Sequence, residues 1–212
     1  MMIEDFGARV TSVWEGLRST TRSLVERALQ TPAAGSAAIK PAHGEGRPYD
    51  ARADWELSRL LTALDESAAE VGASLNAEQT RGLRRMADTC AAMLQGQTQS
   101  AEVFAQLVAR AHRLHDFARI DALADALADR FAPSEICELA RLGNPVVRAL
   151  AQESLAQAPT FLLVRLLVDP VDSDVARDAL ERQAVEYGSE EARQVVNMLD
   201  QADAVAEEDI QE

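Results

Sequence analysis

This chain of 212 residues has few cysteines, no long apolar run and no surplus of positive charge. Its two cysteines, Cys90 and Cys137, are too few for a disulfide framework and fit a reducing compartment, so we expect a cytoplasmic protein. The longest apolar run, around residues 161–168, is much shorter than the roughly 20 residues that span a bilayer. The N-terminus is acidic where a secretory signal would be basic.

Acidic residues outnumber basic ones by 35 to 21, which gives a formal net charge of −14. The phosphate backbone of a nucleic acid repels such a surface, so we do not expect a nucleic-acid partner. The excess lies toward the C-terminus, because residues 131–212 hold 17 acids and only 6 bases. Six of these acids fall in residues 200–212, which we interpret as a solvated acidic tail.

The rest of the composition predicts an all-α fold. The chain has 39 alanines and no convincing alternation of apolar and polar residues. Residues 31–50 are the exception, because three prolines and three glycines there stop a helix and predict a flexible linker. We therefore divide the chain into an N-terminal amphipathic helix at 1–30, the linker at 31–50, an all-helical repeat-like domain at 51–199 and the tail at 200–212. In the domain, Asn76 with Gln79 predicts a capping box, and Asp116 predicts another helix cap.

Residues 1–30 are expected to form one helix, because apolar side chains recur every three or four positions and share a face. Gly7 and Gly16 each cost a helix about 1 kcal/mol relative to alanine, so this helix needs a surface to hold it. That surface could be the body of the same chain, a second copy or a partner protein. Four arginines balance four acids in this segment, which argues against a membrane surface. The face expected to bind a partner consists of Ile3, Phe6, Val10, Val13, Trp14, Leu17 and Leu24.

A two-helix pattern repeats from residue 133 onward. Pro133 and Pro159 each open a short helix and lie 26 positions apart. Asn144 and Asp172 stand where caps of the two following helices are expected. Each pair exposes apolar residues on more than one face, so the pairs must stack on one another to cover them.

The segment 144–155 resembles the second helix of a HEAT-like, or armadillo-like, helical repeat. In that family Asn or Asp, Pro, any residue, Val and Arg are followed by alanine three positions later, and then by a small residue and leucine. The residues that match are Asn144, Pro145, Val147, Arg148, Ala151, Ser154 and Leu155. The next copy has Ala176 in place of the arginine. The resemblance implies a short α-solenoid over about residues 133–199, closed by a capping helix at 188–199.

The same resemblance implies a structural role for Arg148. In the family, an arginine at this position often reaches the acidic loop of the neighbouring repeat. Its expected partner here is Asp169 or Asp172.

The best candidates for catalysis are His112, His115 and Asp116. The dipeptide His115-Asp116 resembles the one in HD-type phosphohydrolases, in which His and Asp ligands hold a divalent metal. That family needs a further histidine on an earlier helix, and the only other histidine, His43, lies in the expected linker. Asp116 also has a role as a helix cap. We therefore expect no metal, no cofactor and no catalytic residue.

The sequence thus predicts a non-catalytic adaptor or scaffold. It would bind protein partners through the helical-repeat surface and the amphipathic N-terminal helix, with self-association through residues 1–30 as a further option. The alternative is a metal-dependent HD-type phosphohydrolase that uses His112, His115 and Asp116.

Overall fold

A computed structural model describes residues 3–30, 49–70 and 75–210, and every regular element in these ranges is helical. The all-α prediction is therefore confirmed for the described residues. The expected linker lies outside them, apart from its last two residues. None of the described helices is both long enough and apolar enough to cross a membrane. The elements are η1 (Ile3–Phe6), α1 (Ala8–Gly16), α2 (Ser19–Gln30), α3 (Ala51–Glu70), α4 (Ala77–Gln97), α5 (Ala101–Arg113), α6 (Phe117–Arg130), α7 (Pro133–Ala140), α8 (Pro145–Ala156), α9 (Thr160–Leu166), α10 (Ser173–Val185) and α11 (Glu190–Ile210).

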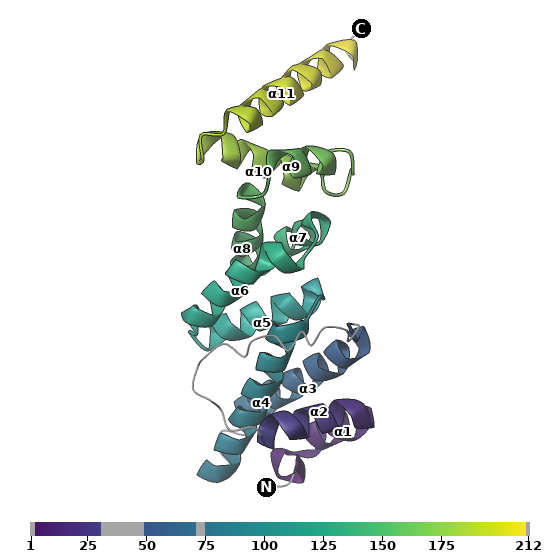
Figure 1. The fold of residues 1–212 in the computed structure, drawn as a ribbon, viewed down its shortest axis with the longest axis vertical. Helices are drawn as coiled ribbons and strands as arrows, with labels where there is room; N and C mark the ends of the chain where they lie inside the picture. The colour runs from purple at the N-terminus through teal and green to yellow at the C-terminus, as the bar shows by residue number, and fades with distance from the viewer. Residues whose placement is uncertain (1–2, 31–48, 71–74, 211–212) are drawn as a thin grey trace. The chain divides into compact units, whose positions relative to one another are not determined.

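The chain divides into two compact units, unit 1 (Met1–Leu107) and unit 2 (Val108–Glu212), with the boundary inside α5. The core of unit 1 is built by α3 and α4, which contact each other and are covered by α1 and α2 (Figure 1). Apolar residues at helical spacing give each of these helices a buried face. The buried leucines and their neighbours on the two faces are Leu57, Leu60, Leu61, Leu64, Leu83, Met86, Cys90 and Leu94.

The N-terminal segment differs from the single helix that the sequence predicts. It forms three elements, because Gly7 has a φ of 100° and Leu17 is extended, with φ −71° and ψ 149°. The second break is held by the buried carboxylate of Glu56 on α3. The backbone amide of Arg18 donates to this carboxylate over 3.4 Å, its Nε over 3.0 Å, and the hydroxyl of Thr21 donates to it as well. The carboxylate of Glu56 thus satisfies the backbone amide of Arg18, which a continuous helix would bond to a carbonyl four residues earlier.

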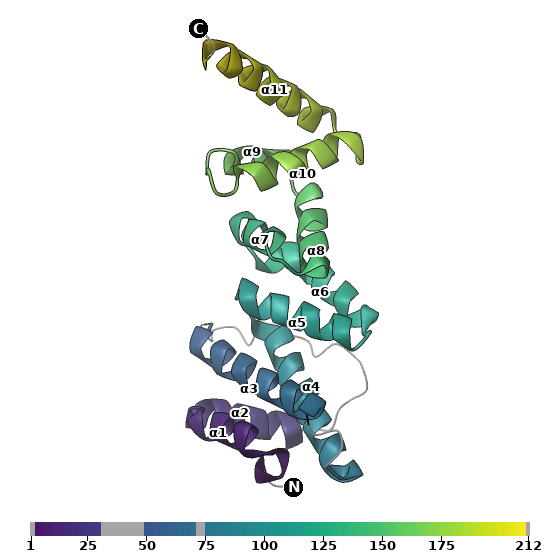
Figure 2. The same cartoon turned by 180° about the vertical axis from the view of Figure 1, so that it is seen from behind.

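Unit 2 contains α6 to α11. Within it, α7 contacts α8 and α9 contacts α10, and each pair lies side by side in both views (Figures 1 and 2). Helices two positions apart in the chain also contact one another. On one side of the unit α6 contacts α8, and α8 contacts α10. On the other side α7 contacts α9, and α9 contacts α11. The apolar residues between these helices are buried and include Leu123, Leu127, Ile136, Leu139, Val147, Leu155, Leu163, Ala176 and Leu180.

Three of the four expected helix caps are confirmed. Asn76 accepts from the amides of Glu78 and Gln79 and completes the capping box with the Gln79 side chain. Asp116 accepts from the amide of Arg119 at 3.1 Å, and Asn144 caps α8 in the same manner. The prediction for Asp172 is wrong, because its side chain makes no cap and is bound by an arginine instead.

The C-terminal helix is longer than the predicted capping helix at 188–199. The helix α11 continues to Ile210, so most of the predicted acidic tail is helical. Arg177 on α10 supports the beginning of this extension, because its two terminal nitrogens bind Asp200 and Asp203, each at 2.5 Å. Charge that would otherwise repel within the helix is neutralised by the neighbouring helix.

Candidate functional site

The residues of the hydrolase alternative, His112, His115 and Asp116, lie at the turn between α5 and α6. His112 and His115 are both exposed, and His115 has a left-handed backbone with φ 55°. The His115 ring packs edge-on against Phe117, with ring centroids 6.3 Å apart. Asp116 is engaged as the cap of α6. Across residues 3–30, 49–70 and 75–210, no three His, Cys, Asp or Glu side chains converge to hold a metal ion.

The predicted partner-binding face of the N-terminal segment packs inside unit 1. Phe6, Val10 and Leu17 are buried, and the hydroxyl of Ser67 on α3 donates to the backbone carbonyl of Phe6 at 2.7 Å. The remaining members, Ile3, Val13, Trp14 and Leu24, are half-buried. Of the surfaces considered for this stripe, the structure therefore uses the body of the same chain.

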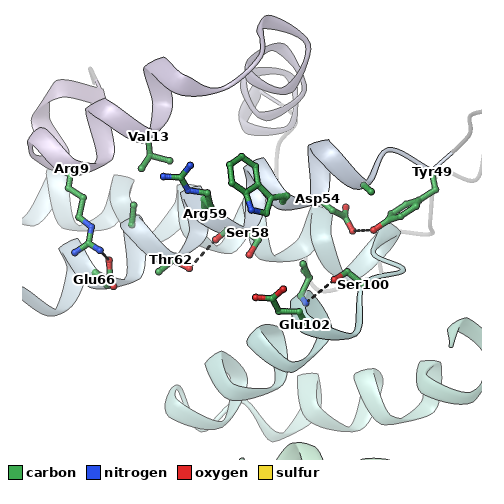
Figure 3. A pocket seen from close by; sticks show the side chains of 14 residues that line it. Arg9, Val13, Tyr49, Asp54, Ser58, Arg59, Thr62, Glu66, Ser100 and Glu102 are labelled. Atoms are coloured by element: carbon green, nitrogen blue, oxygen red, sulfur yellow. Dashed lines mark hydrogen bonds and ion pairs between the residues drawn. The ribbon is translucent and has the colours of Figure 1, made fainter. Parts of the chain in front are cut away.

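A cleft of about 390 Å³ opens on unit 1 between α1 and α3 and the start of α5 (Figure 3). The side chains of Arg9 and Glu66 point toward one another in it and form an ion pair of 2.6 Å. Farther along, the Tyr49 hydroxyl donates to buried Asp54 at 2.9 Å. The guanidinium of Arg59 lies 4.8 Å from the centroid of the exposed Trp55 ring.

The polar side chains at one end of this cleft bond to one another. Burial, reinforced by the hydrogen bond to Asp54, raises the pKa of Tyr49 to about 12, so its hydroxyl stays protonated at neutral pH. Asp54 also accepts a hydrogen bond from the side-chain amide of Gln97 at 3.1 Å, so its carboxylate accepts two hydrogen bonds from neutral donors. Asp54 thereby links Tyr49 to Gln97, the last residue of α4.

The residues that were matched to the repeat pattern, 144–155, cap and form most of α8. Asn144 is the cap, Pro145 is the first helical residue, and the next apolar members face inward. These buried members are Val147, Ala151 and Leu155. The pairing expected for Arg148 is wrong, because this side chain is exposed and pairs neither with Asp169 nor with Asp172.

Arg141, at the end of α7, takes the place that was expected for Arg148. Its Nη1 lies 2.7 Å from Oδ1 of Asp172 and 3.0 Å from the carbonyl oxygen of Val171. The bond joins the loop after α7 to the loop after α9, and Asp172 is almost fully buried beneath it. Sequence reasoning missed Arg141 because it lies outside the repeat motif, and only its position next to a helix end gave a signal.

The joined loops lie beside an exposed apolar strip, which we call the apolar edge: Phe161, Val164, Val168 and Val171. The first three recur at spacings of three and four along α9 and the turn that follows it, so they share one side. Val168 is 85% exposed, although valine is usually buried. The sequence did carry a signal for this surface, since residues 161–168 are its longest apolar run.

A search of protein-family models, of curated proteins and of solved structures found no match to this chain.

Proposed function

We propose that this chain is a non-catalytic, cytoplasmic adaptor or scaffold, and that α7–α11 form a short α-solenoid of HEAT-like repeats that binds a protein partner. The contacts within unit 2 support the solenoid, because alternate helices contact one another: α7, α9 and α11 form one row, and α6, α8 and α10 form the other. Such a stack leaves side chains exposed along each layer, where partners bind.

One observation carries the proposed binding function: exposed large apolar side chains gather in unit 2. Among the described residues, eleven of the thirteen such side chains belong to unit 2. Single exposed hydrophobic residues are ordinary, but an exposed apolar strip indicates an interaction surface. The apolar edge is such a strip, and the Arg141–Asp172 ion pair beside it holds the two loops together.

The experiment compares Val168→Asp on the apolar edge with Val185→Asp near the end of α10. The two valines are 85% and 83% exposed, so both variants add the same charge at equally open positions. The tagged full-length chain and both variants are incubated with extract from the source organism, and the retained proteins are quantified. A candidate partner is then purified and titrated against each form.

We expect a protein that binds the wild type and Val185→Asp but binds Val168→Asp at least about tenfold more weakly, because a charge then lies in the apolar contact. Equal affinity of all three forms for every purified candidate would contradict the role of the apolar edge. Turnover of a phosphate ester that is lost in His115→Ala would favour the hydrolase alternative.

A further inference from the structure

The helix α11 has one face that packs on unit 2 and another that is exposed. Ala192 is buried, and Asp200 and Asp203 are bound by Arg177 of α10, so these three residues mark the packed face. At 100° per residue, Met198 and Val205 lie roughly 120° or more from the centre of that face. They are 60% and 59% exposed.

The exposed face carries an ordered apolar pattern, which we call the α11 stripe: Val195, Met198, Ala202 and Val205. Val195 is half-buried and Ala202 is exposed. The spacings of three, four and three residues are those of the a and d positions in a coiled coil. This spacing fits a second α-helix laid along α11, because knobs at these positions enter the holes of a facing helix.

Charge decides which helix fits. The segment Glu190–Ile210 holds seven acids and one arginine. Arg193 pairs with Glu190, and Arg177 of α10 pairs with Asp200 and Asp203, so among the described residues the unneutralised acids include Glu191 beside the stripe. Glu191 precedes the stripe by four residues, and Asp209 follows it by four. A second copy of α11 would bring acids against acids in either direction, which is unfavourable. A basic partner helix would meet opposite charge at Glu191, and the sequence places further acids after the other end of the stripe.

We propose that the α11 stripe binds a basic amphipathic helix of a partner protein, with apolar residues at a and d spacing and Lys or Arg beside them. This inference rests on the proposed adaptor function and names one class of partner for it. The binding mode is that of a helix laid against an apolar face, with flanking charges that set its orientation.

The test uses a synthetic helical peptide with leucine at a and d positions and lysine at the flanking positions, titrated into the full-length chain. A second peptide keeps the leucines and replaces lysine with glutamate, and a third has the basic composition in scrambled order. The variants are Met198→Asp and Val205→Asp on the stripe. Asn197→Asp is the matched control, because it adds the same charge on an exposed position of α11 about 100° from Met198. Far-UV circular dichroism verifies that each variant keeps its helix content.

We expect the basic peptide to bind the wild type and Asn197→Asp alike. Each stripe variant should bind it at least about tenfold more weakly, and the acidic peptide should not bind measurably. Equal binding of the scrambled peptide, or unchanged affinity in both stripe variants, would overturn the proposal. A dimer of the chain that Met198→Asp converts to a monomer would also overturn it, in favour of self-association. Failure here leaves the Val168→Asp experiment untouched, because that test concerns the apolar edge and not α11.

Discussion

Replacing Arg141 with alanine tests whether the bond between the two loops stabilises unit 2. The change removes two hydrogen bonds, to Asp172 at 2.7 Å and to the Val171 carbonyl at 3.0 Å. A hydrogen bond to a charged group contributes about 1.5–3 kcal/mol, and a carboxylate left buried adds a penalty. The Asp172 side chain is only 6% exposed, whereas the Arg141 side chain is 35% exposed, so solvent weakens the interaction from one side. We expect the free energy of unfolding to fall by about 2 kcal/mol.

Urea titration followed by far-UV circular dichroism measures this loss, with Arg148→Ala as the matched control. Arg148 is an exposed arginine that forms no ion pair with any residue the structure describes, so its removal should change stability by less than about 0.5 kcal/mol. The double variant Arg141→Ala, Asp172→Asn should lose less than the sum of the two single changes, because the two residues interact directly. Equal losses in Arg141→Ala and Arg148→Ala would refute this reasoning and restore the role that the repeat pattern assigned to Arg148.

Three further outcomes follow from single side chains. Burial alone would raise the pKa of Glu56, but the hydrogen bonds from Thr21 and Arg18 outweigh it and hold this pKa below its usual range. The stability that ionised Glu56 contributes is therefore fully present above its unfolded-state pKa of about 4.3 and is lost as the pH falls further. Urea titrations should accordingly show Glu56→Gln less stable than wild type at neutral pH, with a difference that shrinks in acid; a gap that does not vary with pH would contradict this account. Burial raises the pKa of Cys137 to about 11, so only about one thiol in ten thousand is ionised at neutral pH. A maleimide should therefore label Cys137 only when the protein unfolds, which mass spectrometry of digests would show. His115→Gly should raise the free energy of unfolding by about 1 kcal/mol, because glycine adopts a φ of 55° without strain. If urea or thermal unfolding shows this free energy falling by a similar amount, a stabilising contact of the imidazole outweighs the strain.

The features that local sequence determines were predictable, and those that distant residues determine were not. The caps at Asn76 and Asn144 depend on residues two or three positions away, so the sequence alone identifies them. The break at Leu17 depends on Glu56, which is 39 positions along the chain, and helical periodicity cannot detect such a partner.

The candidate surfaces show the same division. The run at 161–168 was visible in the sequence as apolar, but its exposure depends on which sides of α9 are covered by α7, α10 and α11. The pairing of Asp172 was likewise predicted with the wrong arginine, because the motif indicates only that an acid lies near a loop and leaves the donor open. Pattern therefore locates the helices and their inner faces, whereas the choice of partners across loops depends on packing.

The positions of the two tryptophans have a practical consequence. Trp14 lies on α1 and Trp55 on α3, so both indoles belong to unit 1. Intrinsic tryptophan emission consequently reports the environment of that unit alone, while the only aromatic residues of unit 2 are phenylalanines and Tyr187. Emission and circular dichroism recorded on the same sample would thus resolve the melting of one half of the chain from that of the whole.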